Sequence, residues 1–153
     1  AQAQALAKEG ARVVFGDLAD AEGRNVEARI RAAGGEARYV HLDVAREEDW
    51  VAAVRTTIER YGKLDVLVNN AGITIPKVPI EKRTVEEWDR VMAVNVRGVF
   101  LGTKHAIPEM RRAGGGSIVN ISSLAGIGQS QLQESAYATS KAAVRMLSKV
   151  TAT

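Results

Sequence analysis

The sequence has no cysteine and only two histidines, His41 and His105, among its 153 residues. Without cysteine, neither disulfide bonds nor thiolate-bound metal clusters can form, and two histidines far apart in sequence leave a zinc site almost without candidate ligands. We therefore predict no metal site. A chain without disulfides suits a reducing compartment, and we expect a cytoplasmic protein.

The sequence also lacks long stretches of one residue class. No apolar run approaches the length of a membrane-spanning helix. The 21 basic and 18 acidic residues are interspersed, and they leave a net charge of only +3. We therefore expect neither a membrane nor a nucleic acid as partner. The remaining composition, 46% hydrophobic and 25% charged, is that of an ordinary globular domain.

Strand and helix patterns alternate along the chain. Four short apolar segments are typical of strands, at residues 11–17, 36–43, 63–70 and 116–122. Helix patterns separate them, and this alternation predicts a parallel sheet with helices on both faces. The apolar centres of the last two strands, at residues 66–68 and 118–119, predict burial on both faces.

Two long helices are predicted in the second half of the chain. The first covers residues 84–112 and begins with Thr84 and Glu87 in the spacing of a capping box. The second begins near Glu134 or Ser135 and carries Tyr137 and Lys141 in "YATSK". A tyrosine and a lysine four positions apart share a helix face. That spacing alone fits both an ordinary helical turn and a proton-transfer pair.

Polar or small residues follow each predicted strand, where ligands bind in open α/β sheets. An acidic residue such as Asp17 at a strand end of a dinucleotide-binding fold accepts hydrogen bonds from ribose hydroxyls and repels a 2′-phosphate, which favours NAD over NADP. The alternative for Asp17, and equally for Asp43, is a turn or helix-cap residue. The stretch "NNAG" (residues 69–72) either lets the backbone approach a flat ligand or simply ends a strand.

Asn95 lies in the middle of the long predicted helix, in the apolar stretch "MAVNVRG". Asparagine is a poor helix former, and a buried amide needs hydrogen-bond partners. One interpretation is a locally satisfied core residue. The other is an anchor for a carbonyl group or a water molecule in a site.

Taken together and in this order, "NNAG", the asparagine of "MAVNVRG", "SIVNISS" and "YATSK" resemble the short-chain dehydrogenase/reductase family over essentially the whole chain. Each motif alone is weak, but the ordered set on matching strand ends and helices is specific. Together with Asp17, the stretch "RYVHLDVAREEDW" is most similar to NAD-dependent hydroxysteroid and secondary-alcohol dehydrogenases of that family.

The resemblance implies a Rossmann-like, doubly wound parallel sheet and the following site residues. Catalytic residues would be Asn95, Ser123, Tyr137 and Lys141, with Ser123 preferred to Ser122 because the family's serine is the second of the pair. Residues binding NAD would be Asp17, Leu18, Asp43, Val44, Asn70, Ala71, Gly72, Tyr137 and Lys141.

The implied roles agree with simple chemistry. The cofactor carries the hydride, so the protein must move a proton on the substrate oxygen. A phenol titrates near pH ~10, and a neighbouring ammonium such as that of Lys141 favours the phenolate form of Tyr137. Ser123 would hydrogen-bond the substrate oxygen, and Asn95 would hold a water beside Lys141.

The sequence departs from the family pattern at both ends. The glycine-rich turn that binds pyrophosphate, with its strand, does not occur in the chain, nor do the family's C-terminal strands. We therefore expect residues 1–153 to be one partial dinucleotide-binding domain, poorly stable and weakly active by itself. Strands ending at Asp17 and Asn70 would then flank an open position in the sheet.

Three functional hypotheses follow. The leading one is an NAD-dependent oxidoreductase acting on a small secondary alcohol or ketone, assembled as a homo-oligomer (dimer or tetramer) through its two long helices, as is common in the family. The second is an NADP-dependent ketoreductase such as a 3-oxoacyl carrier-protein reductase, against which Asp17 argues. The third is a non-catalytic binding module, against which the complete catalytic set argues.

Overall fold

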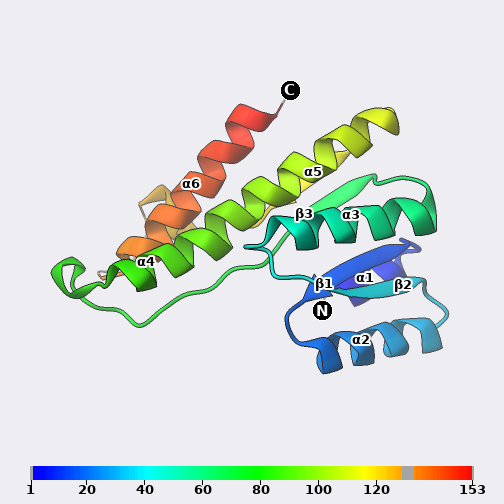
Figure 1. The fold of residues 1–153 in the computed structure, drawn as a ribbon, viewed down its shortest axis with the longest axis horizontal. Coiled ribbons are helices and arrows are strands. Elements are labelled where there is room, and N and C mark those ends of the chain that lie inside the picture. The colour runs from blue at the N-terminus through cyan, green and yellow to red at the C-terminus, as the bar shows by residue number, and fades with distance from the viewer. Residues whose placement is uncertain (1, 129–132, 153) are drawn as a thin grey trace. The chain divides into compact units, whose positions relative to one another are not determined.

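In a computed structural model of the chain, residues 2–128 and 133–152 are described. The chain divides into two compact units, residues 1–64 and residues 65–153, and each contains its own pair of parallel strands (Figure 1). The described strands are parallel and separated by helices, which confirms the predicted α/β class and the Rossmann-like pattern.

The first unit is built on strands β1 and β2. They pair in parallel from Val13 opposite Ala37 to Asp17 opposite His41. Helices α2 and α3 lie on opposite sides of the pair (Figure 1). A small core forms where α1 and α2 meet the strands, and its buried members are Ala7, Val13, Ile30 and Ala37. The elements are α1 (Gln2–Lys8), β1 (Val13–Asp17), α2 (Asp20–Ala32), β2 (Ala37–His41) and α3 (Glu47–Tyr61).

The second predicted strand is shorter than expected. β2 ends at His41, whereas the sequence pattern extends it to Asp43. The reason is local, because the Asp43 carboxylate accepts the backbone N–H of Ala45 at 2.9 Å and so forms a turn. The end of α3 matches its sequence signal, since Gly62 takes the left-handed conformation (φ 79°) and donates to the Ile58 carbonyl at 2.8 Å.

The second unit is built on β3 and β4, which pair in parallel from Val66 opposite Ser117 to Asn69 opposite Asn120. Helix α5 packs against β3 and α6 against β4. The elements are β3 (Val66–Asn69), a 3₁₀ turn (Ile80–Lys82), α4 (Val85–Met92), a π-helical turn (Ala93–Arg97), α5 (Gly98–Arg112), β4 (Ser117–Asn120), a second 3₁₀ turn (Leu124–Ile127) and α6 (Ser135–Thr151).

The long helix starts as predicted but is not uniform. Thr84 accepts the Glu87 N–H at 3.1 Å, and the Glu87 carboxylate accepts the Thr84 N–H at 3.4 Å, which confirms the capping box. The prediction of one continuous α-helix over residues 84–112 is wrong, because a π-helical turn separates α4 from α5 and has Asn95 at its centre. Such single π turns are frequent at functional sites.

The predicted burial of β3 and β4 on both faces is also wrong. Val66 is 52% exposed and Val119 is 44% exposed. Both lie on the face opposite Asn69 and Asn120, since side chains alternate along a strand. The two asparagines instead face the helices: Asn69 bonds Asn120 at 2.8 Å, and Asn120 bonds Ser148 of α6 at 2.9 Å. The helices of this unit therefore cover only one face of its strand pair.

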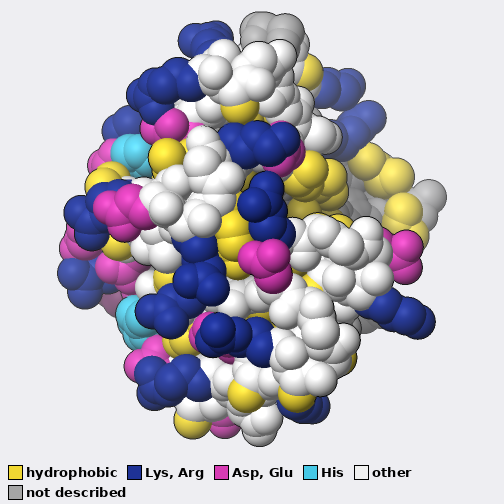
Figure 2. All heavy atoms as spheres, turned by 90° about the vertical axis from the view of Figure 1, so that its right-hand side faces the viewer, with side chains coloured by type: hydrophobic (Ala, Val, Ile, Leu, Met, Phe, Trp, Pro, Cys, Tyr) yellow, Lys and Arg dark blue, Asp and Glu magenta, His cyan; other side chains and the backbone are white. Residues whose placement is uncertain are grey.

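Two features of the structure concern the question of nucleic-acid and membrane partners. Basic and acidic side chains lie among one another on the face shown in Figure 2. Within the part of the chain that the structure describes, no helix combines the length and the apolar character needed to cross a lipid bilayer.

Candidate active site

A pocket of about 450 Å³ lies in the second unit, where the segment after β3, the end of β4 and the start of α6 meet. Three of the sequence motifs, "NNAG", "SIVNISS" and "YATSK", supply residues to its walls. Its lining residues are Asn70, Gly72, Ile73, Thr74, Ile121, Ser122, Glu134, Tyr137 and Lys141.

Tyr137 and Lys141 both line this pocket from α6. The Lys141 ammonium lies 5.8 Å from the centre of the Tyr137 ring, as the i, i+4 spacing predicts. Lys141 is only 4% exposed, and its Nζ donates to the Ile121 carbonyl at 2.8 Å. Burial lowers the pKa of Lys141 below its usual value, because the charged form loses hydration. A desolvated ammonium interacts strongly with any charge that develops beside it.

Two residues fix the backbone of α6 at Lys141. Ser122 donates its hydroxyl to the Lys141 carbonyl at 2.8 Å. A β-carbon at Gly126 would lie 2.7 Å from both the carbonyl carbon and the oxygen of Lys141, so only glycine allows the 3₁₀ turn to approach the helix this closely. The end of β4 and the turn after it therefore set the depth at which Lys141 enters the pocket.

Asn95 is fully buried behind the pocket and joins two of its walls. Its Oδ1 accepts the Ile73 N–H at 2.8 Å, and its Nδ2 donates to the Ile73 carbonyl at 2.9 Å and to Ser140 Oγ at 3.0 Å. Ser140 in turn donates to the Tyr137 carbonyl at 2.7 Å. Both amide hydrogens are thus used, and among the described residues Oδ1 has a single donor, so one of its lone pairs is open to a further donor such as water.

Gly72 lets the backbone after β3 pass close to the charged group of Lys141. A β-carbon there would lie 3.3 Å from Lys141 Nζ and 3.4 Å from Asn95 Oδ1, so any side chain would crowd both. Glycine at this position is therefore explained by packing against Lys141 and Asn95, and the approach of a flat ligand to "NNAG" stays a prediction. Asn70 shares the lining, whereas Ala71 is not among the lining residues.

The two neighbouring serines differ in position. Ser122 lines the pocket, but its hydroxyl already donates its hydrogen to the Lys141 carbonyl. Ser123 is not among the lining residues, and its Oγ accepts the Ala125 N–H at 3.2 Å at the start of the 3₁₀ turn. In the described part of the chain its hydroxyl hydrogen has no acceptor. The catalytic role of Ser123 stays a prediction.

Sequence reasoning missed several residues of this site, among them Ser122 as a backbone anchor, Ser140 as the partner of Asn95, and Glu134 in the lining. Glu134 pairs with Lys77 at 3.3 Å, which ties the segment after β3 to the start of α6. Ser140 stands three positions after Tyr137, on the same helical face, and this spacing was the available signal. The ion pair joins residues far apart in sequence and left no local pattern.

The predicted adenosine-binding residues lie in the first unit, at the ends of β1 and β2. Asp17 is exposed, and its Oδ1 accepts the Ala19 N–H at 3.0 Å; Leu18 is 61% exposed. The Asp43 N–H donates to Asp49 at 2.8 Å, and the Val44 carbonyl accepts the indole N–H of Trp50 at 3.0 Å, so α3 holds that turn. The first unit thus places these four residues at neighbouring strand ends.

Comparison with known proteins agrees with this geometry. The pattern of the short chain dehydrogenase family matches residues 1–153. The chain belongs to the short-chain dehydrogenase family. It is 45% identical to a 2,5-dichloro-2,5-cyclohexadiene-1,4-diol dehydrogenase of Sphingobium indicum. The matched stretch of 152 residues covers 99% of this chain and 60% of that protein.

Two further relatives share this level of similarity. A cyclopentanol dehydrogenase of Comamonas testosteroni is 46% identical over 96% of this chain and 58% of its own. A 3-alpha-(or 20-beta)-hydroxysteroid dehydrogenase of Mycobacterium tuberculosis is 47% identical over 97% of this chain and 55% of its own. The chain therefore spans somewhat more than half the length of these curated relatives. The family resemblance inferred from the motifs is confirmed.

Proposed function

We propose that the protein is an oxidoreductase that transfers a hydride between NAD(H) and a secondary alcohol or ketone, with Tyr137 as general acid and base. The observation that carries this proposal is the pairing of Tyr137 with the buried ammonium of Lys141 in one pocket. The names of the three relatives support it, since a cyclopentanol, a cyclohexadiene diol and a 3-alpha- or 20-beta-hydroxysteroid all carry a secondary alcohol.

The residues present fit a nicotinamide dinucleotide. The pocket of about 450 Å³ lined by Gly72, Tyr137 and Lys141 has room for a flat ring, and Asp17 offers an exposed carboxylate for a ribose. Asn70, Ala71 and Gly72 would line the nicotinamide end, with Lys141 and Tyr137 on its ribose. The adenosine end would be held by Asp17, Leu18, Asp43 and Val44. When bound, the nicotinamide accepts the hydride of the alcohol carbon or returns it to a ketone.

The protein's own part of the reaction is the proton. In alcohol oxidation the substrate hydroxyl gives its proton to Tyr137 Oη, and in ketone reduction the phenol returns it. Lys141 favours the phenolate through its charge. Ser123 donates to the substrate oxygen, and the free lone pair of Asn95 Oδ1 binds a water that links Lys141 to solvent.

We also infer that residues 1–153 form part of a single dinucleotide-binding domain and that the protein is a dimer or tetramer. Val91 and Val99, on the first of the two long helices, are buried within the second unit and so belong to its core. The exposed apolar side chains on α5 and α6 support a contact there instead. They are Phe100 (48%), Met146 (58%) and Val150 (67%).

The test is alcohol oxidation by the full-length protein, with cyclopentanol as substrate and either NAD or NADP as cofactor. Tyr137→Phe should lower kcat by roughly 10²- to 10⁴-fold, because it removes the proton carrier. Tyr61→Phe, a tyrosine at the end of α3, should leave kcat unchanged. A preference for NADP would favour the ketoreductase hypothesis instead. Equal activity of wild type and Tyr137→Phe would refute the proposed mechanism.

A further inference from the structure

Tyr39 of β2 reaches the turn that follows β1. Its hydroxyl lies 2.8 Å from the Asp17 carbonyl and 2.7 Å from Asp20 Oδ1, so the single phenolic hydrogen is shared between these two acceptors. The Asp17 carbonyl also accepts the Leu42 N–H at 3.1 Å. The main chain of Asp17 is therefore held from β2 by one backbone and one side-chain donor.

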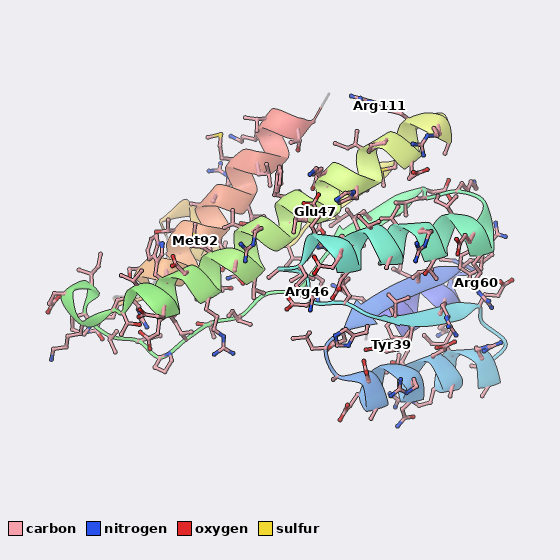
Figure 3. The ribbon with its side chains drawn as sticks, in the orientation of Figure 1. Tyr39, Arg46, Glu47, Arg60, Met92 and Arg111 are labelled. Atoms are coloured by element: carbon pink, nitrogen blue, oxygen red, sulfur yellow. The ribbon has the colours of Figure 1, made fainter. Side chains whose placement is uncertain are left out.

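The ring of Tyr39 is itself fixed in place. Tyr39 is 6% exposed and lies between β2 and α2 (Figure 3). A β-carbon at Gly23 would lie 2.1 Å from its Cε2, so only glycine in α2 makes room for the ring. The Phe15 ring packs against it with 5.7 Å between the ring centres, and Glu27 accepts its backbone N–H at 3.0 Å. These contacts leave the hydroxyl little freedom to move.

Asp20, the first residue of α2, is the second anchor. Its Oδ1 accepts from Tyr39 and lies 2.8 Å from His41 Nδ1. The hydrogen bond from Tyr39, and then that from His41, keeps the pKa of Asp20 below its usual value. Burial and, next, the bond to Asp20 raise the pKa of Tyr39 to about 12. At neutral pH the pair is therefore a neutral donor and an anionic acceptor.

The side chain of Asp17 has much less support than its backbone. Its Oδ1 accepts only the Ala19 N–H, and in the described part of the chain its other carboxylate oxygen has no hydrogen bond. The direction in which this exposed carboxylate points therefore depends on the main chain of residues 17–20. Tyr39 joins both ends of that turn, the carbonyl of Asp17 and the carboxylate of Asp20.

We propose that Tyr39 is a positioning residue for cofactor selection: by fixing the turn 17–20, it holds the Asp17 carboxylate where it accepts a ribose 2′-hydroxyl and repels a 2′-phosphate. This inference rests on the proposed function. It adds a residue that contacts no cofactor and acts through Asp17. Loosening the turn lets the carboxylate swing aside, which weakens NADH binding and relieves the penalty on NADPH.

The experiment is a nicotinamide-fluorescence titration of the full-length protein with NADH and with NADPH. The readout is the ratio of the two dissociation constants, NADPH over NADH. Tyr39→Phe removes only the shared hydroxyl, and we expect it to lower this ratio by about three- to tenfold, the worth of one hydrogen bond. Tyr61→Phe is the matched control and should keep the wild-type ratio. Asp20→Ala removes one anchor and should shift the ratio in the same direction, even if Tyr39→Phe fails to fold.

A double variant separates action through Asp17 from a general structural effect. In an Asp17→Ala background, Tyr39→Phe should change the ratio no further. Equal weakening of both cofactors by Tyr39→Phe, or an unchanged ratio in both Tyr39→Phe and Asp20→Ala, would overturn the inference alone. If Asp17→Ala itself leaves the wild-type ratio unchanged, the NAD assignment of the proposed function fails, and the role of Tyr39 fails with it.

Discussion

The two units hold their candidate functional groups in opposite ways. In the second unit, Asn95 and Lys141 are buried, and their polar atoms bond directly to the backbone of neighbouring segments. In the first unit, Asp17 is exposed, and the structure fixes its main chain rather than its carboxylate. Proton transfer needs groups at defined distances in a poorly hydrated pocket, whereas recognition of a ribose needs an acceptor open to the ligand.

This difference predicts where substitutions are costly. A lost partner in the second unit leaves buried polar groups unpaired, whereas a loosened turn in the first exposes groups that water can satisfy. Each unit has a single tryptophan, Trp50 in α3 and Trp88 in α4. Replacing one of them by phenylalanine lets the fluorescence of the other report unfolding of its own unit.

The largest effect is expected for Asn95→Ala. The change removes three hydrogen bonds and leaves the N–H and carbonyl of Ile73 without their partner. We expect a loss of about 3 kcal/mol in the free energy of unfolding, measured by urea denaturation with Trp88 fluorescence. Asn25→Ala, an exposed asparagine of α2, is the control, and about 0.5 kcal/mol or less is expected there. Equal losses of unfolding free energy at both positions would contradict the proposed difference between buried and exposed polar groups.

Gly126→Ala should cost about 2 kcal/mol, because its β-carbon would press on the Lys141 backbone rather than on a movable side chain. Gly72→Ala gives a sharper contrast within the same unit. Its β-carbon would meet the tip of the Lys141 side chain, so it should disturb NADH binding more than stability. Urea denaturation and NADH titration of both variants test this. Similar losses of stability in both would contradict the assigned difference.

Thr84→Ala should cost about 1 kcal/mol, because it removes the cap of α4 but leaves the freed N–H groups open to water. Thr84 and Asn95 belong to the same unit. A smaller loss at Thr84 would therefore show that burial of the freed groups, and not the unit they belong to, determines the cost in stability. Thr84→Ser keeps the acceptor oxygen and should restore most of the stability. A loss at Thr84→Ala as large as that at Asn95→Ala would show that exposure does not limit the cost.

The sequence predicted the parts of the molecule that depend on neighbouring residues. The capping box at Thr84 and the shared face of Tyr137 and Lys141 are both short-range patterns. The predictions that failed concern packing: Val66 and Val119 are apolar yet exposed, because the helices of their unit cover the other face. An apolar strand centre shows that a strand is compatible with burial, not which faces receive a partner.

The contacts that position the site were also out of reach of sequence reasoning. Asn95 was recognised as an unusual helix residue, but its partner Ile73 lies 22 positions away. Tyr39 looked like an ordinary strand residue in "RYVHLD", and its hydroxyl meets Asp17 only because β1 and β2 pair in a register that places Asp17 opposite His41. Both roles depend on long-range pairing, which local periodicity does not encode.

The smallest effect at neutral pH is expected from the ionisation of Tyr39. Its pKa in the folded chain is about 12, against about 10 when unfolded, so the fold favours the neutral phenol. Between these values the unfolded chain has lost a proton that the folded chain retains, and stability therefore falls as the pH rises from about 10 to about 12.

Tyr39→Phe should lack this fall while matching the wild-type slope at pH 7, and Tyr61→Phe should keep it. The ultraviolet absorbance of tyrosinate gives the direct measurement. A wild-type minus Tyr39→Phe difference that titrates near 10 would mean that neither burial nor the bond to Asp20 keeps the phenol neutral, and the described anchoring of the turn in the first unit would then be wrong.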